Sequence, residues 1–164
     1  MTKQEKYDNY FINRCFEAAA MSYCKRGQVG AVAVRDNRTI LDGWNGTIPG
    51  TDNCCETKVC NKCNGCGTID IAHGTIECPR CNGEGKTTDH GLVIHAERNI
   101  IFYAAKEGIP LEGTTMYITH APCIGCAQAM AASGIKEVVY KNDYKTTEGV
   151  DFLRSINIKV RQIK

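Results

Sequence analysis

The sequence has no long hydrophobic run and no excess of charge of one sign. No apolar stretch approaches the roughly 20 residues of a transmembrane helix, and the N-terminal segment MTKQEKYDNYF lacks the apolar core of a secretory signal peptide. Lys and Arg together number 20 against 18 Asp and Glu, so the formal net charge is +2. That charge is too close to neutral to predict nonspecific electrostatic binding to DNA or RNA over a large surface. We expect a cytoplasmic protein with neither a membrane nor a nucleic-acid partner.

Cysteine, by contrast, is abundant, with 11 in 164 residues. Without a secretory signal a disulfide framework is not expected, and Cys-x-x-Cys spacing in an intracellular chain favours metal binding. Most of the cysteines fall between residues 54 and 90, where glycine is frequent and hydrophobic periodicity is weak. We expect residues 54–90 to be an insertion that is held together by metal, because the stretch has too few apolar residues for a core of its own.

Hydrophobic periodicity outside the insertion predicts alternating helices and strands. Helices are expected over residues 3–23, 96–106, 123–133 and 148–155, and strands over 29–34, 39–44, 114–119, 136–140 and 156–163. This order predicts one α/β domain over residues 1–164, a three-layer α/β/α sandwich with a central five-stranded mixed sheet. The small zinc-bound insertion interrupts it.

The insertion contains two copies of one motif. Cys60-x-x-Cys63-x-Gly-x-Gly is followed by Cys78-x-x-Cys81-x-Gly-x-Gly, and both resemble the zinc repeats of the DnaJ chaperone family. The glycines permit tight turns that bring each thiolate pair onto one ion. Four cysteine ligands close a tetrahedral zinc site, so we expect this zinc to be structural. The segment between the pairs, residues 64–77, is expected to form a hairpin.

A second metal site is predicted from His95, Cys123 and Cys126. Three protein ligands leave the fourth position of a tetrahedral zinc open to water, which distinguishes a catalytic site from a closed one. Cys123 and Cys126 begin a predicted helix, where the helix dipole stabilises thiolate, and Glu97 is placed to move protons. The pattern His-x-Glu…Pro-Cys-x-x-Cys is typical of zinc-dependent nucleobase deaminases. The alternative is a structural zinc with Glu97 simply in solvent.

Several segments resemble the cytidine and deoxycytidylate deaminase superfamily, and within it the phage and bacterial deoxycytidylate (dCMP) deaminases. They are VGAV (29–32), GWNG (43–46), NCC (53–55), HAERN (95–99), GTTMYIT (113–119), APCIGC (121–126) and SGIKEVVY (133–140). Two positions depart from the family pattern: Trp44 replaces the usual Tyr, and Arg98 replaces an apolar residue. Because tRNA adenosine deaminases also carry Gly-Trp-Asn, Trp44 makes the sequence harder to distinguish from that group of enzymes.

The resemblance implies roles for individual residues. His95, Cys123 and Cys126 would bind the catalytic zinc and Glu97 would shuttle protons. Asn45, Ala96 and Tyr144 would bind substrate, with Lys141 and Lys145 as further candidates for the 5′-phosphate. The alternatives are that Asn45 is a turn residue and that the residues after the fourth strand are solvated.

The implied activity is zinc-dependent deamination of dCMP to dUMP and ammonia, which supplies dUMP for dTMP synthesis. The family resemblance further implies a hexamer that dCTP activates and dTTP inhibits, with Mg²⁺ accompanying the effector nucleotide. If the gene is carried by a phage, the enzyme would act in the host cytoplasm. The rival interpretations are a tRNA adenosine or free-base deaminase, and a non-catalytic zinc protein that binds partners through its chaperone-like repeat.

A further structural zinc is also implied by the resemblance to phage dCMP deaminases. Its candidate ligands are Cys24, Cys54 and His90, with Cys55 or Cys66 as a fourth.

Overall fold

The computed structural model describes residues 1–24, 27–50, 58–87 and 93–163. The chain divides into two compact units, which are described separately: one comprises residues 1–22, 27–46 and 94–164, and the other residues 23–26 and 47–93. The second unit contains the cysteine-rich stretch that we expected over residues 54–90. No helix among the described residues is long and apolar enough to cross a membrane.

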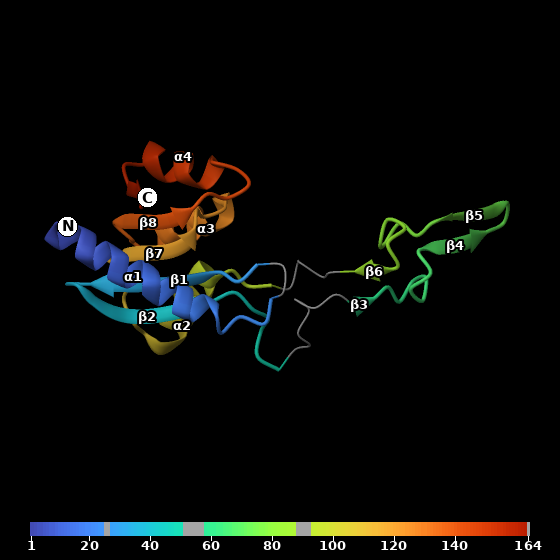
Figure 1. Ribbon diagram of the computed structural model, residues 1–164, viewed down its shortest axis with the longest axis horizontal. Coiled ribbons are helices and arrows are strands. Elements are labelled where there is room, and N and C mark those ends of the chain that lie inside the picture. The colour runs from blue at the N-terminus through green and yellow to red at the C-terminus, as the bar shows by residue number, and fades with distance from the viewer. Residues whose placement is uncertain (25–26, 51–57, 88–92, 164) are drawn as a thin grey trace. The chain divides into compact units, whose positions relative to one another are not determined.

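The first unit is built on a five-stranded mixed sheet with the strand order β2-β1-β7-β8-β9 (Figure 1). Its strands are β1 (Gly30–Arg35), β2 (Arg38–Trp44), β7 (Thr115–His120), β8 (Glu137–Asn142) and β9 (Lys159–Gln162). Strand β1 pairs antiparallel with β2 and with β7, whereas β7, β8 and β9 run parallel to one another. Asp36 and Asn37 form the β1–β2 hairpin turn, both with positive φ, as a two-residue loop of this type requires.

Helix α1 (Lys3–Ala19) covers one face of the sheet. Its residues Phe11, Ile12 and Cys15 pack against buried side chains of β1, β7 and β8, which are Val32, Val34, Tyr117 and Val139. Thr2 caps the helix: its hydroxyl accepts a hydrogen bond from the Glu5 amide, and the Glu5 carboxylate accepts one from the Thr2 amide. This reciprocal capping satisfies two backbone donors at the helix start.

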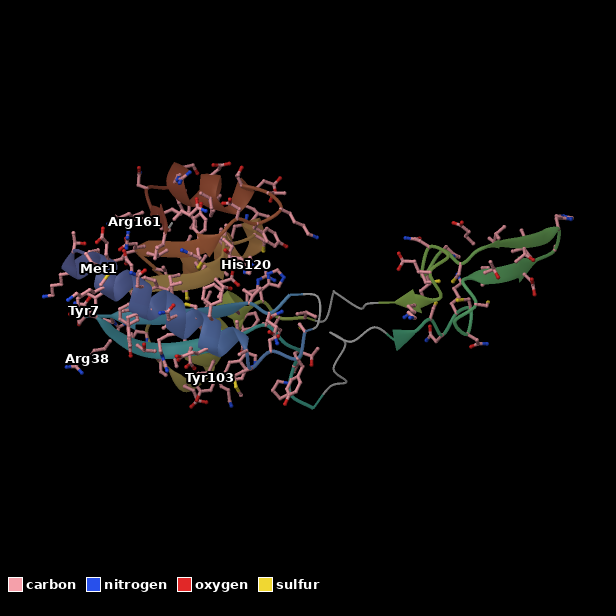
Figure 2. All side chains as sticks on the ribbon, in the orientation of Figure 1. Met1, Tyr7, Arg38, Tyr103, His120 and Arg161 are labelled. Carbon is pink, nitrogen blue, oxygen red and sulfur yellow. The ribbon has the colours of Figure 1, made fainter. Side chains whose placement is uncertain are left out.

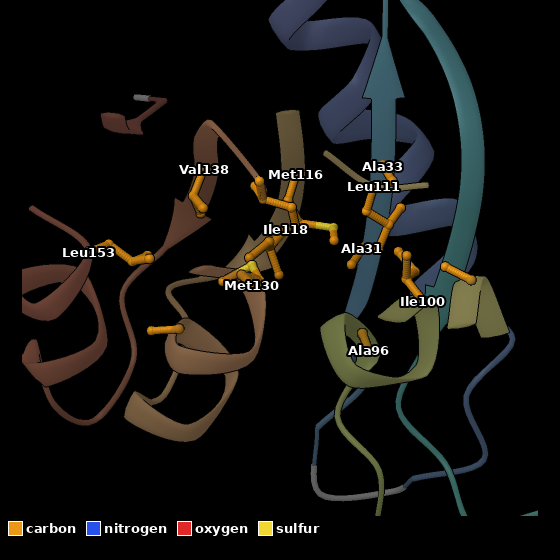
Figure 3. Packing of buried hydrophobic residues seen from close by; sticks show 13 residues of the cluster. Ala31, Ala33, Ala96, Ile100, Leu111, Met116, Ile118, Met130, Val138 and Leu153 are labelled. Atoms are coloured by element: carbon orange, nitrogen blue, oxygen red, sulfur yellow. The ribbon is translucent and has the colours of Figure 1, made fainter. Parts of the chain in front are cut away.

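Helices α2 (Ala96–Glu107), α3 (Ile124–Ala132) and α4 (Glu148–Ser155) contribute to the main core on the opposite face. Strands β1 and β7 alternate strictly, so Ala31, Ala33, Met116 and Ile118 point into this core while their neighbours point toward α1 (Figure 3). Successive side chains of these strands therefore enter the two cores on opposite faces of the sheet in turn, as the strand period of two residues requires. The predicted three-layer sandwich with a five-stranded mixed sheet is confirmed.

A charged network joins the first helix to the last strand. Arg161 on β9 donates two hydrogen bonds to the Asp8 carboxylate, at 2.6 and 3.0 Å, and one to Glu137 at 2.6 Å. The Tyr117 hydroxyl donates to Asp8 at 2.8 Å. Figure 2 shows Arg161 near the start of α1. Burial acts to raise the pKa of Asp8, but the hydrogen bonds from Arg161, Gln4 and Tyr117 and the charge of Arg161 outweigh it, so the pKa lies below its ordinary value.

Among its described residues, the second unit contains the two Cys-x-x-Cys turns, here called knuckles, a pair of short strands and one hairpin. Strand β3 (Lys58–Val59) pairs with β6 (Lys86–Thr87), and β4 (Thr68–Ile71) pairs with β5 (Gly74–Glu77), the hairpin expected within residues 64–77. The Cys60 amide donates to the Gly85 carbonyl at 2.9 Å, and the equivalent Cys78 amide donates to the Gly67 carbonyl at 2.8 Å. The sequence repeat is therefore also a structural repeat.

Two glycines allow the knuckles to interlock. A β-carbon on Gly67 would collide with the Gly83 carbonyl, and one on Gly85 would collide with the Gly65 carbonyl. Both glycines also have positive φ, which side-chain-bearing residues adopt only at a cost. Glycine is thus required at these two positions both because φ is positive and because a β-carbon would collide with a neighbouring carbonyl group.

Candidate active site

The start of helix α2 is fixed by contacts with strand β2. His95 is the N-cap residue of α2, and the Asn99 amide group donates to the Trp44 carbonyl at 2.9 Å. Gly43 lets the strand approach closely, because a β-carbon there would lie 2.8 Å from the Ile100 side chain. Gly46 and Ile94 form a short antiparallel bridge just before the helix. These contacts hold His95 at the end of the sheet beside the GWNG segment.

The start of helix α3 brings the two cysteines to His95. Cys123 is the N-cap residue of α3, and Cys126 lies in the first turn. Nδ1 of His95 lies 3.6 Å from Sγ of Cys123 and 3.4 Å from Sγ of Cys126. In a tetrahedral zinc site, bonds of about 2.3 Å to sulfur and 2.0 Å to nitrogen place these atoms about 3.6 Å apart. The three side chains therefore have the spacing of zinc ligands, and the fourth position is left for a water or substrate.

Charge also favours a cation between these residues. Burial raises the pKa of Cys126, and the nearby Glu97 carboxylate and Cys123 thiolate raise it further. Burial lowers the pKa of His95, with a smaller contribution from Arg98, so its imidazole is neutral, the form that binds metal. Two thiolates and a carboxylate in one buried site need a compensating positive charge, which a divalent ion supplies.

Glu97 lies in the first turn of α2 and is buried, with 3% of its surface exposed. Burial raises its pKa, and hydrogen bonds with its own backbone and with Cys126, together with the charge of Arg98, offset this only partly. Among the described residues, no cationic group lies within ion-pair distance of its carboxylate. A buried carboxyl group with a raised pKa, two residues from a metal ligand, is suited to accept and return a proton.

The order of helices and strands does not identify a family, whereas the comparisons with known proteins do. The model of the cytidine and deoxycytidylate deaminase zinc-binding region matches residues 5–142. The chain belongs to this family. The chain is 37% identical to ComE operon protein 2 of Bacillus subtilis over 141 residues, and 33% identical to the deoxycytidylate deaminase of Schizosaccharomyces pombe over 160 residues. The matches cover 85% and 95% of this chain but 61% and 44% of those longer proteins.

A solved structure resembles this chain over nearly its whole length. The dCMP deaminase of cyanophage S-TIM5, in complex with dCMP and dUMP, superposes with a TM-score of 0.72 at 29% sequence identity. The alignment covers 99% of each chain. The likeness therefore includes the cysteine-rich unit as well as the five-stranded sheet.

The predicted substrate-binding residues lie in different parts of the first unit. Asn45 is buried, its Oδ1 accepts a hydrogen bond from the Val29 amide at 2.8 Å, and its Nδ2 donates to the Gly27 carbonyl at 2.9 Å. Each of the two atoms retains capacity for one more hydrogen bond, so Asn45 serves the turn and can still contact a ligand. Ala96 is fully buried in the first turn of α2, and Tyr144 is 41% exposed after β8. Their substrate contacts stay predictions.

The segment after β8 contacts residues 121–123, the loop that ends at the predicted zinc ligand Cys123, at both of its ends. At one end the Ala121 amide donates to the Asn142 carbonyl at 2.8 Å. At the other, Gly149 packs so closely that a β-carbon would collide with the Pro122 carbonyl and lie 2.9 Å from the Cys123 carbonyl carbon. Residues 143–147, including Tyr144, are therefore held beside Cys123. The role of Gly149 was missed from the sequence; the only signal was a glycine in the first turn of a predicted helix.

Cys60, Cys63, Cys78 and Cys81 form the second cluster, and all four are buried. Sγ of Cys60 lies 3.8 Å from that of Cys78, and Sγ of Cys63 lies 3.7 Å from that of Cys81. A tetrahedral zinc with four sulfur ligands requires a separation of about 3.8 Å. Burial and the other three sulfurs raise the pKa of Cys81 to about 12, because a thiolate is disfavoured in an apolar site beside other sulfur groups that can ionise.

The further zinc site has no complete ligand set within the described residues. Cys54, Cys55 and His90 lie outside them. Cys24 is buried and disulfide-bonded, a state in which its sulfur is not a thiolate ligand. Cys66 is exposed and close to the carbonyls of Cys63 and Thr68, at 2.8 and 3.1 Å. A third zinc stays a prediction.

Proposed function

We propose that the protein deaminates dCMP to dUMP and ammonia, and so supplies dUMP for dTMP synthesis. The observation that carries the proposal is the group of three side chains with the spacing of zinc ligands, together with one buried carboxyl group, Glu97, which interacts with Cys126. The cyanophage relative with dCMP and dUMP bound supports the choice of nucleotide.

The residues divide the chemistry between them. A zinc ion held by His95, Cys123 and Cys126 would lower the pKa of a water molecule toward neutrality when bound. Glu97 would take a proton from that water and pass it to N3 of the cytosine ring. The oxygen of that water would bond to C4 of the ring. Glu97 would then take the proton of the new C4 hydroxyl group and deliver it to the exocyclic amine, and the C4–N bond would break, so that water and dCMP give dUMP and ammonia. Asn45 and the Ala96 backbone would orient the base.

The phosphate would be held by the segment after β8. Tyr144 and Lys145 in this segment supply a hydroxyl donor and a cation, and Lys141 near the end of β8 supplies a second cation. Both ends of the segment contact residues 121–123. A mononucleotide needs only a few such groups, in agreement with the near-neutral net charge.

The insertion zinc, bound by Cys60, Cys63, Cys78 and Cys81, would be structural and permanent. We further propose a cytoplasmic homohexamer, activated by dCTP and inhibited by dTTP, each with Mg²⁺. Family resemblance supports these properties, which light scattering and steady-state kinetics with each nucleotide would test.

The decisive experiment is a substrate panel. Ammonia release is measured with dCMP, dCTP, deoxycytidine and tRNA, each with and without dCTP as activator, on the wild type and on Glu97→Ala. We expect release from dCMP, and a Glu97→Ala variant that keeps its zinc but loses activity. Release from tRNA alone would instead support an adenosine deaminase, and a wild type inactive on every substrate would support a non-catalytic zinc protein. The tRNA-specific deaminase structure that this chain resembles is 20% identical, a likeness that extends to the fold alone.

A further inference from the structure

Arg98 breaks a local rule of helix electrostatics. It lies in the first turn of α2, where the helix dipole disfavours cations and acidic residues are usual. Its guanidinium extends over the first turn of α3 as well, because a β-carbon on Gly125 would lie 2.5 Å from Nη2 of Arg98. The side chain is exposed, and within the described part of the chain no carboxylate lies within ion-pair distance of it. Neither stability nor pairing explains this cation.

The proximity of Arg98 to the active site offers an explanation. Arg98 directly follows Glu97 in the sequence, and its guanidinium lies against Gly125, the residue before Cys126. Gly125, directly before Cys126, provides the room for the guanidinium to reach this position. A side chain at position 125 would force the guanidinium away.

The charge balance of the site shows what such a cation does. With a divalent metal bound, two thiolates and the Glu97 carboxylate leave one net negative charge, and moving a proton from water to Glu97 does not alter that sum. A nucleoside monophosphate brings nearly two further negative charges at pH 7, since the second pKa of a phosphate ester is about 6. An anionic substrate would therefore approach a negatively charged metal site, so a cation beside the metal ligands would favour its binding in addition to Lys141 and Lys145.

We propose that Arg98 determines the preference of this site for an anionic, phosphate-bearing substrate over the neutral nucleoside. The guanidinium, held over Gly125 at the paired starts of α2 and α3, neutralises the excess negative charge around the metal. The inference rests on the proposed function, because it names the residue that suits the same site to a nucleotide.

The test compares Arg98→Gln, which removes the charge, with Arg98→Lys, which keeps it. Lys106→Gln is the matched control, because it removes an exposed cation from the other end of the same helix. For Arg98→Gln we expect KM for dCMP to rise about threefold to tenfold, with kcat and zinc content retained, and the effect to shrink as salt is added. KM for deoxycytidine should not change, and Arg98→Lys and Lys106→Gln should resemble the wild type.

Equal losses for dCMP and deoxycytidine, or a fall in kcat alone, would overturn the proposal, because either result would mean that Arg98 acts on the metal or the fold. The same comparison by calorimetry with the product dUMP and with deoxyuridine needs no turnover and keeps the Glu97 carboxylate in place. If the wild type binds dCMP without deaminating it, the proposed function is rejected, and the binding comparison still tests the role of Arg98. If the wild type binds the nucleotide and the nucleoside with equal affinity, or binds neither of them, the proposed role of Arg98 is rejected.

Discussion

Two buried cysteines illustrate how residues of one type take different roles. Cys15 and Cys126 are both fully buried, and burial raises the pKa of each thiol. Cys15 packs among apolar side chains of α1 and the sheet, whereas Cys126 lies 3.4 Å from His95 Nδ1. Burial alone therefore does not distinguish a small hydrophobic residue from a metal ligand; the neighbouring donor atom does.

Serine substitution should separate these roles. We expect Cys126→Ser to lose the catalytic zinc and all measurable ammonia release, because a hydroxyl is a poor zinc ligand at neutral pH. Cys15→Ser should keep both and lower the free energy of unfolding by about 1–3 kcal/mol, the cost of burying a hydroxyl. Zinc content by atomic emission and urea unfolding check the pair. Full zinc content in Cys126→Ser would contradict the assigned ligand.

Among the elements, helix α4 has an unexpected part in the site. Its first turn lies directly on the backbone of Pro122 and Cys123, with Gly149 at the contact, and Leu153 on the same helix enters the main core. Helix α4 thus connects the core to the loop that carries a zinc ligand. A substitution at this contact should therefore alter the position of Cys123 relative to the other zinc ligands.

We expect Gly149→Ala to displace this loop, because the added methyl group overlaps carbonyl atoms that cannot rotate away. Overpacking of this kind costs about 1–3 kcal/mol. The visible absorption of the cobalt-substituted protein, which reports ligand geometry, should shift, and kcat should fall. Gly27→Ala, where an added β-carbon meets nothing within 4 Å, is the control. An unshifted spectrum in Gly149→Ala would show that α4 does not position Cys123.

The Asp8–Arg161 pair connects α1 to β9 and gives stability a defined pH dependence. Because the pKa of Asp8 is lower in the folded protein, the stabilisation is complete above the unfolded value of about 3.9. It is lost as the pH falls toward the folded value.

Asp8→Asn should therefore reduce the free energy of unfolding at pH 7 by about 2 kcal/mol, the usual contribution of hydrogen bonds to a charged group. It should also flatten the loss of stability at acid pH. Glu17→Gln, which breaks an exposed ion pair with Arg14, should cost less than about 0.5 kcal/mol. Urea unfolding from pH 3 to pH 8 measures both variants. Similar costs for the two would refute the importance of the buried pair.

At the scale of the whole molecule, the two units depend on metal in different ways. The first has a hydrophobic core of 13 buried residues, while the buried apolar cluster of the second consists of the four cysteines with Ile69 against them. The first unit therefore has a core that can fold without metal, whereas the second depends on its zinc.

Cys60→Ser should thus remove one zinc per chain and unfold the second unit while the helices of the first remain. Zinc analysis, far-ultraviolet circular dichroism and limited proteolysis of residues 58–87 check this. Gly67→Ala should weaken the same site more than Gly74→Ala, because both glycines have positive φ but only Gly67 is packed against another carbonyl. An unchanged zinc count in Cys60→Ser would sink the proposed structural site.

Much of the fold was predictable because its signals are local. The helix over residues 148–155 was predicted to the residue, and strand and helix order followed from periodicity. The first helix was expected to reach residue 23 but ends at Ala19, because the Ser22 hydroxyl donates to the Asn45 carbonyl and turns the chain. The last strand is shorter than residues 156–163, since Asn157 adopts a positive φ.

The sequence by itself determined the chemistry of this protein, because its metal-binding residues occur in short motifs whose spacing is set by single turns of chain. His-x-Glu, Pro-Cys-x-x-Cys and the two Cys-x-x-Cys-x-Gly-x-Gly repeats needed no tertiary information. Only the tertiary structure decided which residues surround those motifs. It brought Asp8 to Arg161 across 153 positions, set Gly149 against Pro122, and placed Arg98 over Gly125, since contacts between distant segments depend on packing that no local pattern encodes.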